Sequence, residues 1–77
     1  MDIVVTVHGT IRSYVNLSEE PIRLAVDDGT TVGDVVGRLG IPLEGGWNAG
    51  IGSKLVSAGD VLHDGDRLSV FDVIGGG

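Results

Sequence analysis

The 77 residues of this chain allow one small domain, and no apolar stretch is long enough to span a membrane. There is no cysteine, so disulfides, thiolate metal sites and cysteine nucleophiles are excluded, and a chain without disulfides suits the cytoplasm. Eleven acidic residues against five Lys and Arg give a net charge of −6, which argues against nucleic acid as a partner.

Two strands are expected in the first third of the chain. Residues 2–8 alternate, and because both faces of this segment carry valine, we expect a strand in the middle of a sheet. Residues 11–20 have no clean period and carry several turn formers, which favours a loop with at most a short helical turn. Residues 22–26 alternate again before an Asp-Asp-Gly turn ends the strand.

One helix is expected after Thr31, a good N-cap, with Asp34 as its capping-box partner. Four apolar residues between 32 and 39 follow i, i+3, i+4, i+7 spacing, and the Gly-Ile-Pro sequence that follows ends the helix. Gly33 and Gly37 each cost about 1 kcal/mol relative to alanine, so packing rather than propensity must hold this helix. We expect the two glycines to let the helix approach the strands closely.

The last third of the chain is expected to supply three more strands. Residues 47–51 and 54–56 form a hairpin around Gly52-Ser53, because glycine in the first position of a two-residue loop is typical of a type II′ turn. An Asp-Gly-Asp turn then leads into a final strand over residues 67–73.

The order of these elements predicts an α+β fold of two layers, with a mixed sheet of four to five strands packed on one main helix. The first and last strands are both apolar where they would meet, so we expect them to be parallel neighbours in the centre. This is the β-grasp, or ubiquitin-like, arrangement. The predicted core consists of Ile3, Val5, Val7, Ile22, Leu24, Val26, Val32, Val35, Val36, Leu39, Leu68 and Val70.

The chain ends in three glycines, which we separate from the domain. Residues 1–74 are assigned to the β-grasp domain and residues 75–77 to a flexible C-terminal tail, because a run of glycines holds neither helix nor strand. The segment from Val73 to Gly77 extends up to about 17 Å. That length suits a carboxylate that threads a narrow channel into another protein, and the alternative is a frayed end without a function.

Five motifs follow one another along the chain: IVVTV at residues 3–7, TVGDVVGRLG at 31–40, AGIGSKLV at 49–56, LHDGDRLSVF at 62–71 and a final VIGGG. Together they resemble the ubiquitin-like sulfur carriers of the MoaD/ThiS type, and the resemblance covers nearly the whole chain. These carriers include the small subunit of molybdopterin synthase and the thiamine-thiazole sulfur carrier.

Two details of the sequence distinguish the two kinds of carrier, and they conflict. The FDVIGGG ending is closer to the thiazole carriers, whereas the long segment from Gly9 to Ile22 and its Thr10-Ile11-Arg12 turn are closer to the molybdopterin subunit. We favour the molybdopterin type, because a change of loop length alters the geometry more than one tail residue does.

The resemblance implies chemistry at the carboxylate of Gly77. In this family an ATP-dependent, E1-like adenylating enzyme activates that carboxylate, and sulfur from a persulfide protein displaces AMP to leave a thiocarboxylate. The sulfur then passes to the large subunit of molybdopterin synthase or to another sulfur acceptor. Gly76 and Gly75 would thread the tail into these partners. The chain itself would bind no cofactor and would be a carrier rather than an enzyme, with ATP used by the activating enzyme.

One face of the sheet is expected to dock on these partners. Alternation places Phe71 and Val73 on the face of the sheet that points away from the helix. An exposed aromatic side chain beside a reactive tail is typical of a residue that contributes strongly to binding a partner protein. Val4 and Thr6 would extend this patch, and Arg67 would pair with acidic groups of a partner, although a solvated charge is the simpler reading.

Two alternative functions are compatible with the sequence, and no metal site is expected. The chain could be a protein modifier joined through Gly77 to lysines of other proteins, or a β-grasp binding module with an unreactive end. His8 and His63 are far apart in the sequence and no third ligand accompanies them, so no metal site is expected.

Overall fold

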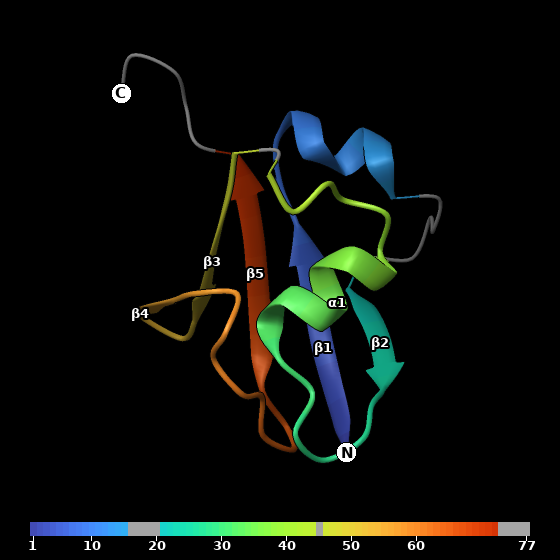
Figure 1. Ribbon diagram of the computed structural model, residues 1–77, viewed down its shortest axis with the longest axis vertical. Coiled ribbons are helices and arrows are strands. Elements are labelled where there is room, and N and C mark those ends of the chain that lie inside the picture. The colour runs from blue at the N-terminus through green and yellow to red at the C-terminus, as the bar shows by residue number, and fades with distance from the viewer. Residues whose placement is uncertain (16–20, 45, 73–77) are drawn as a thin grey trace.

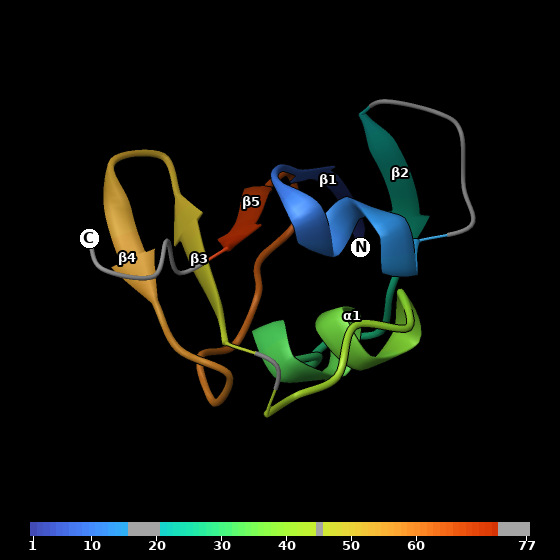
Figure 2. The ribbon, with the colours of Figure 1, turned by 90° about the horizontal axis from the view of Figure 1, so that it is seen from above.

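Each strand expected from alternating residues forms in the computed structural model, which describes residues 1–15, 21–44 and 46–72. The strands build one layer and the helix α1 lies across one face of them, as the two views in Figures 1 and 2 show. No helix in these described ranges is long and apolar enough to cross a membrane. The elements in chain order are β1 (Asp2–Val7), the 3-10 helix η1 (Thr10–Tyr14), β2 (Ile22–Ala25), α1 (Val32–Arg38), β3 (Trp47–Ile51), β4 (Lys54–Val56) and β5 (Arg67–Asp72).

The sheet runs in the order β2-β1-β5-β3-β4, so the first and last strands are neighbours. β1 and β5 are parallel and pair Val5 with Leu68, whereas every other neighbouring pair is antiparallel. The expected mixed sheet with a central parallel pair is therefore confirmed. The short helical turn allowed between the first two strands is η1, which follows β1 at the end of the sheet.

The helix α1 begins where its cap predicts. The Thr31 hydroxyl accepts a hydrogen bond from the Asp34 N–H at 3.2 Å, and the Asp34 carboxylate accepts one from the Thr31 N–H at 3.0 Å. The prediction that Gly33 and Gly37 let the helix approach the strands closely is wrong. A Cβ on Gly33 would lie 3.1 Å from Ala58 in the loop after β4, so the close approach is to this loop and not to a strand. A Cβ on Gly37 would have no neighbour within 4 Å.

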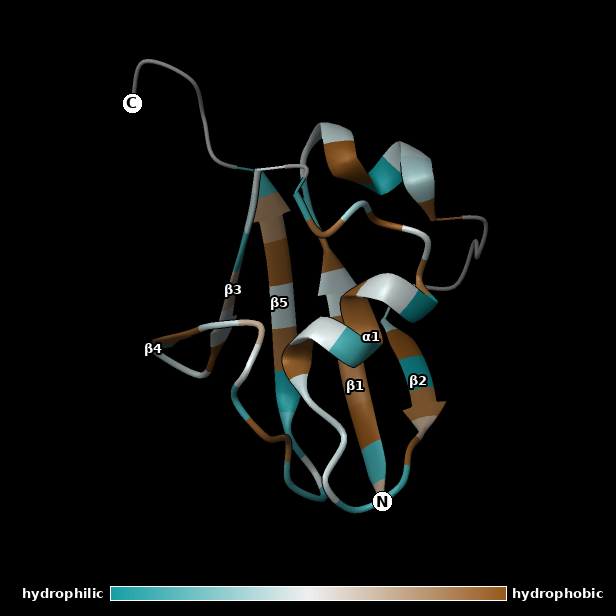
Figure 3. Cartoon of the chain, in the orientation of Figure 1, coloured by the Kyte–Doolittle hydropathy of each residue, from teal (hydrophilic) through white to brown (hydrophobic). Residues whose placement is uncertain are grey.

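The core forms between α1 and the sheet, where the apolar stretches of β1, β5 and α1 face one another (Figure 3). Of the predicted core, all members are buried except Leu24, which is half-buried and packs against the core from the edge strand β2. Five further core residues come from segments without a readable period or with a single apolar position. They are Ile11, Val15, Ile41, Ala49 and Leu62.

The hairpin of β3 and β4 has the predicted turn. Gly52 has a φ of 61°, and no residue other than glycine has a positive φ in the described part of the chain. A positive φ at the first loop position alone is the mark of a type II′ turn. Because this two-residue loop sets the register, Leu55 stands opposite Gly50.

Candidate functional site

The face of the sheet away from α1 brings together four of the residues predicted to dock, namely Val4, Thr6, Arg67 and Phe71. Val4 in β1 pairs in register with Arg23 of β2 and with Arg67 of β5, and Thr6 pairs with Ser69. Residues paired in register point to the same side, and the alternate residues of β1 are buried beneath the helix. We call this surface the open face; its members are Val4, Thr6, Arg23, Asn48, Gly50, Leu55, Arg67, Ser69 and Phe71.

Phe71 is the aromatic residue of the open face. It lies two residues after Ser69 on β5 and pairs with Asn48 of β3. Its side chain is half-buried, yet it belongs neither to the core nor to the partly buried residues that pack against the core. Phe71 therefore lies on the predicted side of the sheet, and its role in docking stays a prediction. Val73, predicted beside it, lies outside the described residues.

Five members of the open face were not predicted to dock, and two of them, Leu55 and Arg23, are the most informative. Leu55 is 74% exposed on β4, and Arg23 is exposed on β2. The outward position of Leu55 could have been predicted from the turn at Gly52. A two-residue loop determines which residues of the two strands pair and therefore point to the same face of the sheet. Arg23 alternates with Ile22 and Leu24, so its outward position was readable, but its neighbour Arg67 comes from a strand 44 positions later in the chain.

The two arginines flank a shallow hollow on the open face. The hollow has a volume of about 360 Å³ and is lined by Val4, Thr6, Pro21, Arg23 and Arg67. Neither guanidinium makes a hydrogen bond or an ion pair with another residue of the described ranges. In a chain with a net charge of −6, this is a local concentration of positive charge that suits a carboxylate of a partner protein.

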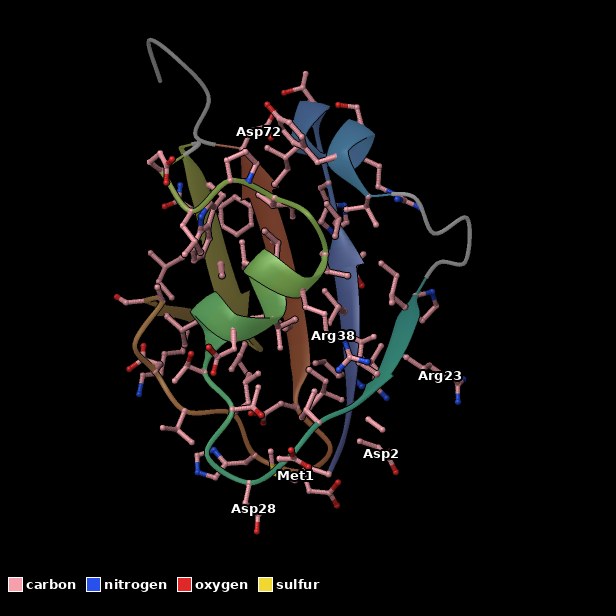
Figure 4. The ribbon with its side chains drawn as sticks, turned by 45° about the vertical axis from the view of Figure 1, so that its right-hand side comes forward. Met1, Asp2, Arg23, Asp28, Arg38 and Asp72 are labelled. Carbon is pink, nitrogen blue, oxygen red and sulfur yellow. The ribbon has the colours of Figure 1, made fainter. Side chains whose placement is uncertain are left out.

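Asp72, the last residue of β5, is hydrogen-bonded to η1, which lies near the N-terminus of the chain. Its carboxylate accepts a hydrogen bond from the Thr10 N–H at 2.7 Å, one from the Ile11 N–H at 3.0 Å and one from the Thr10 hydroxyl. Figure 4 shows Asp72 at the end of β5 beside η1. The carboxylate thus binds otherwise unpaired donors at the start of a short helix, as a side-chain cap does.

Gly9 makes room for this contact. It has a φ of 82°, and a Cβ built on it would lie 2.9 Å from the Cγ of Asp72. Any side chain at this position would therefore strain the backbone and push the carboxylate away. No local sequence pattern links Gly9 with Asp72, because the two residues are 63 positions apart in the chain.

The hydrogen bonds lower the pKa of the Asp72 carboxyl below its ordinary value. The largest cause is the Thr10 hydroxyl, followed by the Ile11 N–H. Because the folded state has the lower pKa, the ionised form contributes stability above the unfolded pKa of about 3.9. This contribution is lost as the pH falls through the lower, folded pKa.

We therefore expect the urea midpoint of the natural chain to exceed that of Asp72→Asn by a constant amount from about pH 7 to about pH 5. The gap should narrow below about pH 4, as Asp72 takes up a proton in the unfolded chain and then in the folded one. Urea titrations at several pH values measure this gap, with Asp60→Asn as a control in another loop. A gap that stays the same down to about pH 2 would contradict the account.

The residues predicted to carry the chemistry, Gly75, Gly76 and Gly77, lie outside the described residues, as does the predicted boundary after residue 74. In the ranges that the structure does describe, no three His, Asp or Glu side chains come together as metal ligands. His8 and His63 are both exposed and belong to different segments. The site therefore has two described parts, the open face and the Asp72 contact at the end of β5.

Two solved structures share this fold along essentially the whole chain. The crystal structure of SAMP1 from Haloferax volcanii aligns with a TM-score of 0.73 and 20% sequence identity, covering 100% of each chain. The crystal structure of H. volcanii small archaeal modifier protein 1 aligns with a TM-score of 0.72 and 18% identity, covering 95% of this chain and 98% of that one. No protein-family model and no curated protein matches the chain. The likeness confirms the predicted ubiquitin-like β-grasp fold.

Proposed function

We propose that this chain is a ubiquitin-like sulfur carrier that donates sulfur from the C-terminal glycine, Gly77, in the biosynthesis of molybdopterin. The observation that supports this most is where the last strand of the fold ends. The central strand β5 ends at Asp72, and the five residues that follow it finish in three glycines. A β-grasp domain therefore presents a short chain without bulky side chains at its end, as a carrier of an activated acyl group requires.

The chemistry needs an activated carboxylate, because a free carboxylate is a poor electrophile. A Gly77 carboxylate oxygen attacks the α-phosphorus of ATP, which releases pyrophosphate and leaves an acyl-adenylate. Sulfur from a persulfide protein then attacks the acyl carbon, AMP leaves, and reduction of the sulfur–sulfur bond by a thiol frees the thiocarboxylate. No side chain of this chain takes part, so it is a substrate and subunit of other enzymes and not itself an enzyme.

The open face is the surface proposed to meet these enzymes. Phe71 and Leu55 supply apolar area, and the pair Arg23 and Arg67 supplies positive charge beside Val4. The proposed partners are an ATP-dependent, E1-like adenylating enzyme, a persulfide sulfur donor and the large subunit of molybdopterin synthase, all in the cytoplasm. A thiazole-forming acceptor is the second choice of pathway, because the FDVIGGG ending resembles the thiazole carriers.

A second candidate function is that of a protein modifier joined through Gly77 to lysines of other proteins. The observation that favours it is that one matched structure is that of a protein named a small archaeal modifier. Both functions share the acyl-adenylate. They differ in the nucleophile that attacks it, which is a sulfur atom for the carrier and a lysine amine for the modifier.

Intact mass spectrometry tests the carrier function. After incubation with ATP, a sulfur-carrier-activating enzyme and a persulfide donor, the chain should gain the mass difference between sulfur and oxygen. The gain should not occur when ATP is left out. Absence of the gain with an enzyme set that sulfurates a known carrier would contradict the proposal. Conjugates in which another protein gains the mass of the chain less one water would favour the modifier.

A further inference from the structure

We propose that Asp72 is a positioning residue: by holding the end of β5 against η1, it fixes the point from which the C-terminal tail reaches into the active site of a partner. The inference rests on the proposed function, because it concerns the delivery of Gly77. Its structural half concerns only the described contact between the two ends of the sequence, and can be tested on the isolated chain.

The contact holds Asp72 from two sides. On one side its backbone pairs in register with Trp47 of β3, which makes it the last rung of the β3–β5 ladder. On the other side its carboxylate accepts bonds from two backbone N–H groups and one hydroxyl of Thr10 and Ile11. Charge-assisted bonds of this kind are stronger than neutral ones and define the direction of the side chain. Asp72 is therefore fixed in position and orientation.

The receiving element is itself rigid. Ile11 is 4% exposed and belongs to the hydrophobic core, so η1 cannot shift without opening the core. The Ser13 hydroxyl also donates to the Thr10 carbonyl at 2.9 Å, within the same turn. Gly9 leaves the space that the Asp72 carboxylate occupies, because a Cβ on residue 9 would collide with that carboxylate. The contact thus ties the end of β5 to the core and not to a loose loop.

The position of Asp72 determines how far the tail extends. Five residues follow it, so a fully extended tail would place the Gly77 Cα about 17 Å from the Asp72 Cα. If the contact opened and the last rungs at Phe71 and Asp72 separated, the tail would lengthen by about 7 Å and start from a variable point. Reactions between bound groups are sensitive to such changes, and a misplacement of about 1 Å can cost about 100-fold in rate.

A purely structural role is the competing explanation, in which Asp72 only caps η1. Two variants separate the explanations. Asp72→Asn keeps the shape of the side chain and removes its charge. Thr10→Val removes the hydroxyl that donates to Asp72, and it keeps the two backbone N–H groups and the charge of Asp72. Asp60→Asn is the matched control, because the Asp60 carboxylate likewise accepts a backbone N–H, from Ser57 at 2.7 Å, in a loop away from β5.

The first measurement is the ATP–pyrophosphate exchange catalysed by the activating enzyme with each variant as substrate. For Asp72→Asn we expect kcat to fall between about 10-fold and about 100-fold while KM stays within about twofold, since the open face still docks. Thr10→Val should lower kcat in the same direction, and Asp60→Asn should leave it unchanged. A fall no larger than that of Asp60→Asn, or a rise in KM alone, would overturn the positioning role.

The second measurement uses the isolated chain. The ¹⁵N order parameters of Phe71 and residue 72, the last two residues of β5, should be lower in Asp72→Asn and Thr10→Val than in the natural chain and in Asp60→Asn. Equal values in all four proteins would overturn the inference. If the natural chain is not adenylated by any activating enzyme, the proposed function fails, and the order parameters alone then decide whether Asp72 holds the start of the tail.

Discussion

Deletion of Gly76 and Gly77 is expected to abolish both adenylation and sulfur transfer while leaving the free energy of unfolding unchanged. The shortened tail would end about 7 Å earlier, so its carboxylate would no longer reach an active site shaped for the full tail. No residue of the described fold changes, because β5 and its contact with η1 end at Asp72. Loss of adenylation with an unchanged free energy of unfolding would show that the tail is needed for function and not for the stability of the domain.

The measurement is ATP–pyrophosphate exchange together with a urea titration of both chains. Deletion also distinguishes the three candidate functions. A carrier loses its thiocarboxylate and a modifier loses its conjugates in cell extract, whereas a plain binding module keeps its partner affinity. An unchanged exchange rate in the shortened chain would therefore contradict both reactive functions together.

Leu68→Ala is expected to remove a large part of the stability of the domain. Leu68 is 1% exposed in β5, the middle strand, where it pairs with Val5 of β1 and with Ile51 of β3. Truncation of a buried leucine costs about 2–5 kcal/mol through the lost transfer energy and the cavity left behind. A domain of 77 residues has a total stability of about 4–12 kcal/mol, so a substantial unfolded fraction is expected.

Urea titration followed by fluorescence of Trp47 measures this loss, since Trp47 is the single tryptophan and is half-buried. Leu55→Ala is the matched control: it removes the same atoms from a side chain that is 74% exposed, and should change stability by less than about 0.5 kcal/mol. Equal losses in the two variants would mean that the core is not where the structure has it. Reduced binding by Leu55→Ala, with stability kept, would instead support docking through the open face.

The fold was largely predictable because its signals are local. The alternation in the strands, the cap at Thr31 and the loop at Gly52 each lie within a few residues, and each determines an element or a register. The parallel pairing of β1 with β5 was also predicted, because the first and last strands are both apolar where they meet under the helix. Agreement among such local signals is what directs a chain to one fold.

The site was less predictable because its contacts join distant parts of the chain. Asp72 meets Thr10 across 62 positions, and Arg23 faces Arg67 only because β1 lies between their strands. Neither pair has a spacing or a motif that could be seen beforehand. The burial of Ile11 was not predicted for a different reason. A short 3-10 helix has no repeating apolar pattern from which a buried residue could be recognised.

The parallel pairing of β1 and β5 also determines how the domain resists mechanical force. The N-terminal end of β1 and the C-terminal end of β5 lie at opposite ends of the same pair of strands (Figure 1). A pull on the tail against the N-terminus would load the evenly spaced hydrogen bonds of this pair in shear, all at once, rather than unzip them one by one. The domain should therefore resist unfolding more strongly when it is pulled between these two ends than when one strand is peeled from an antiparallel neighbour.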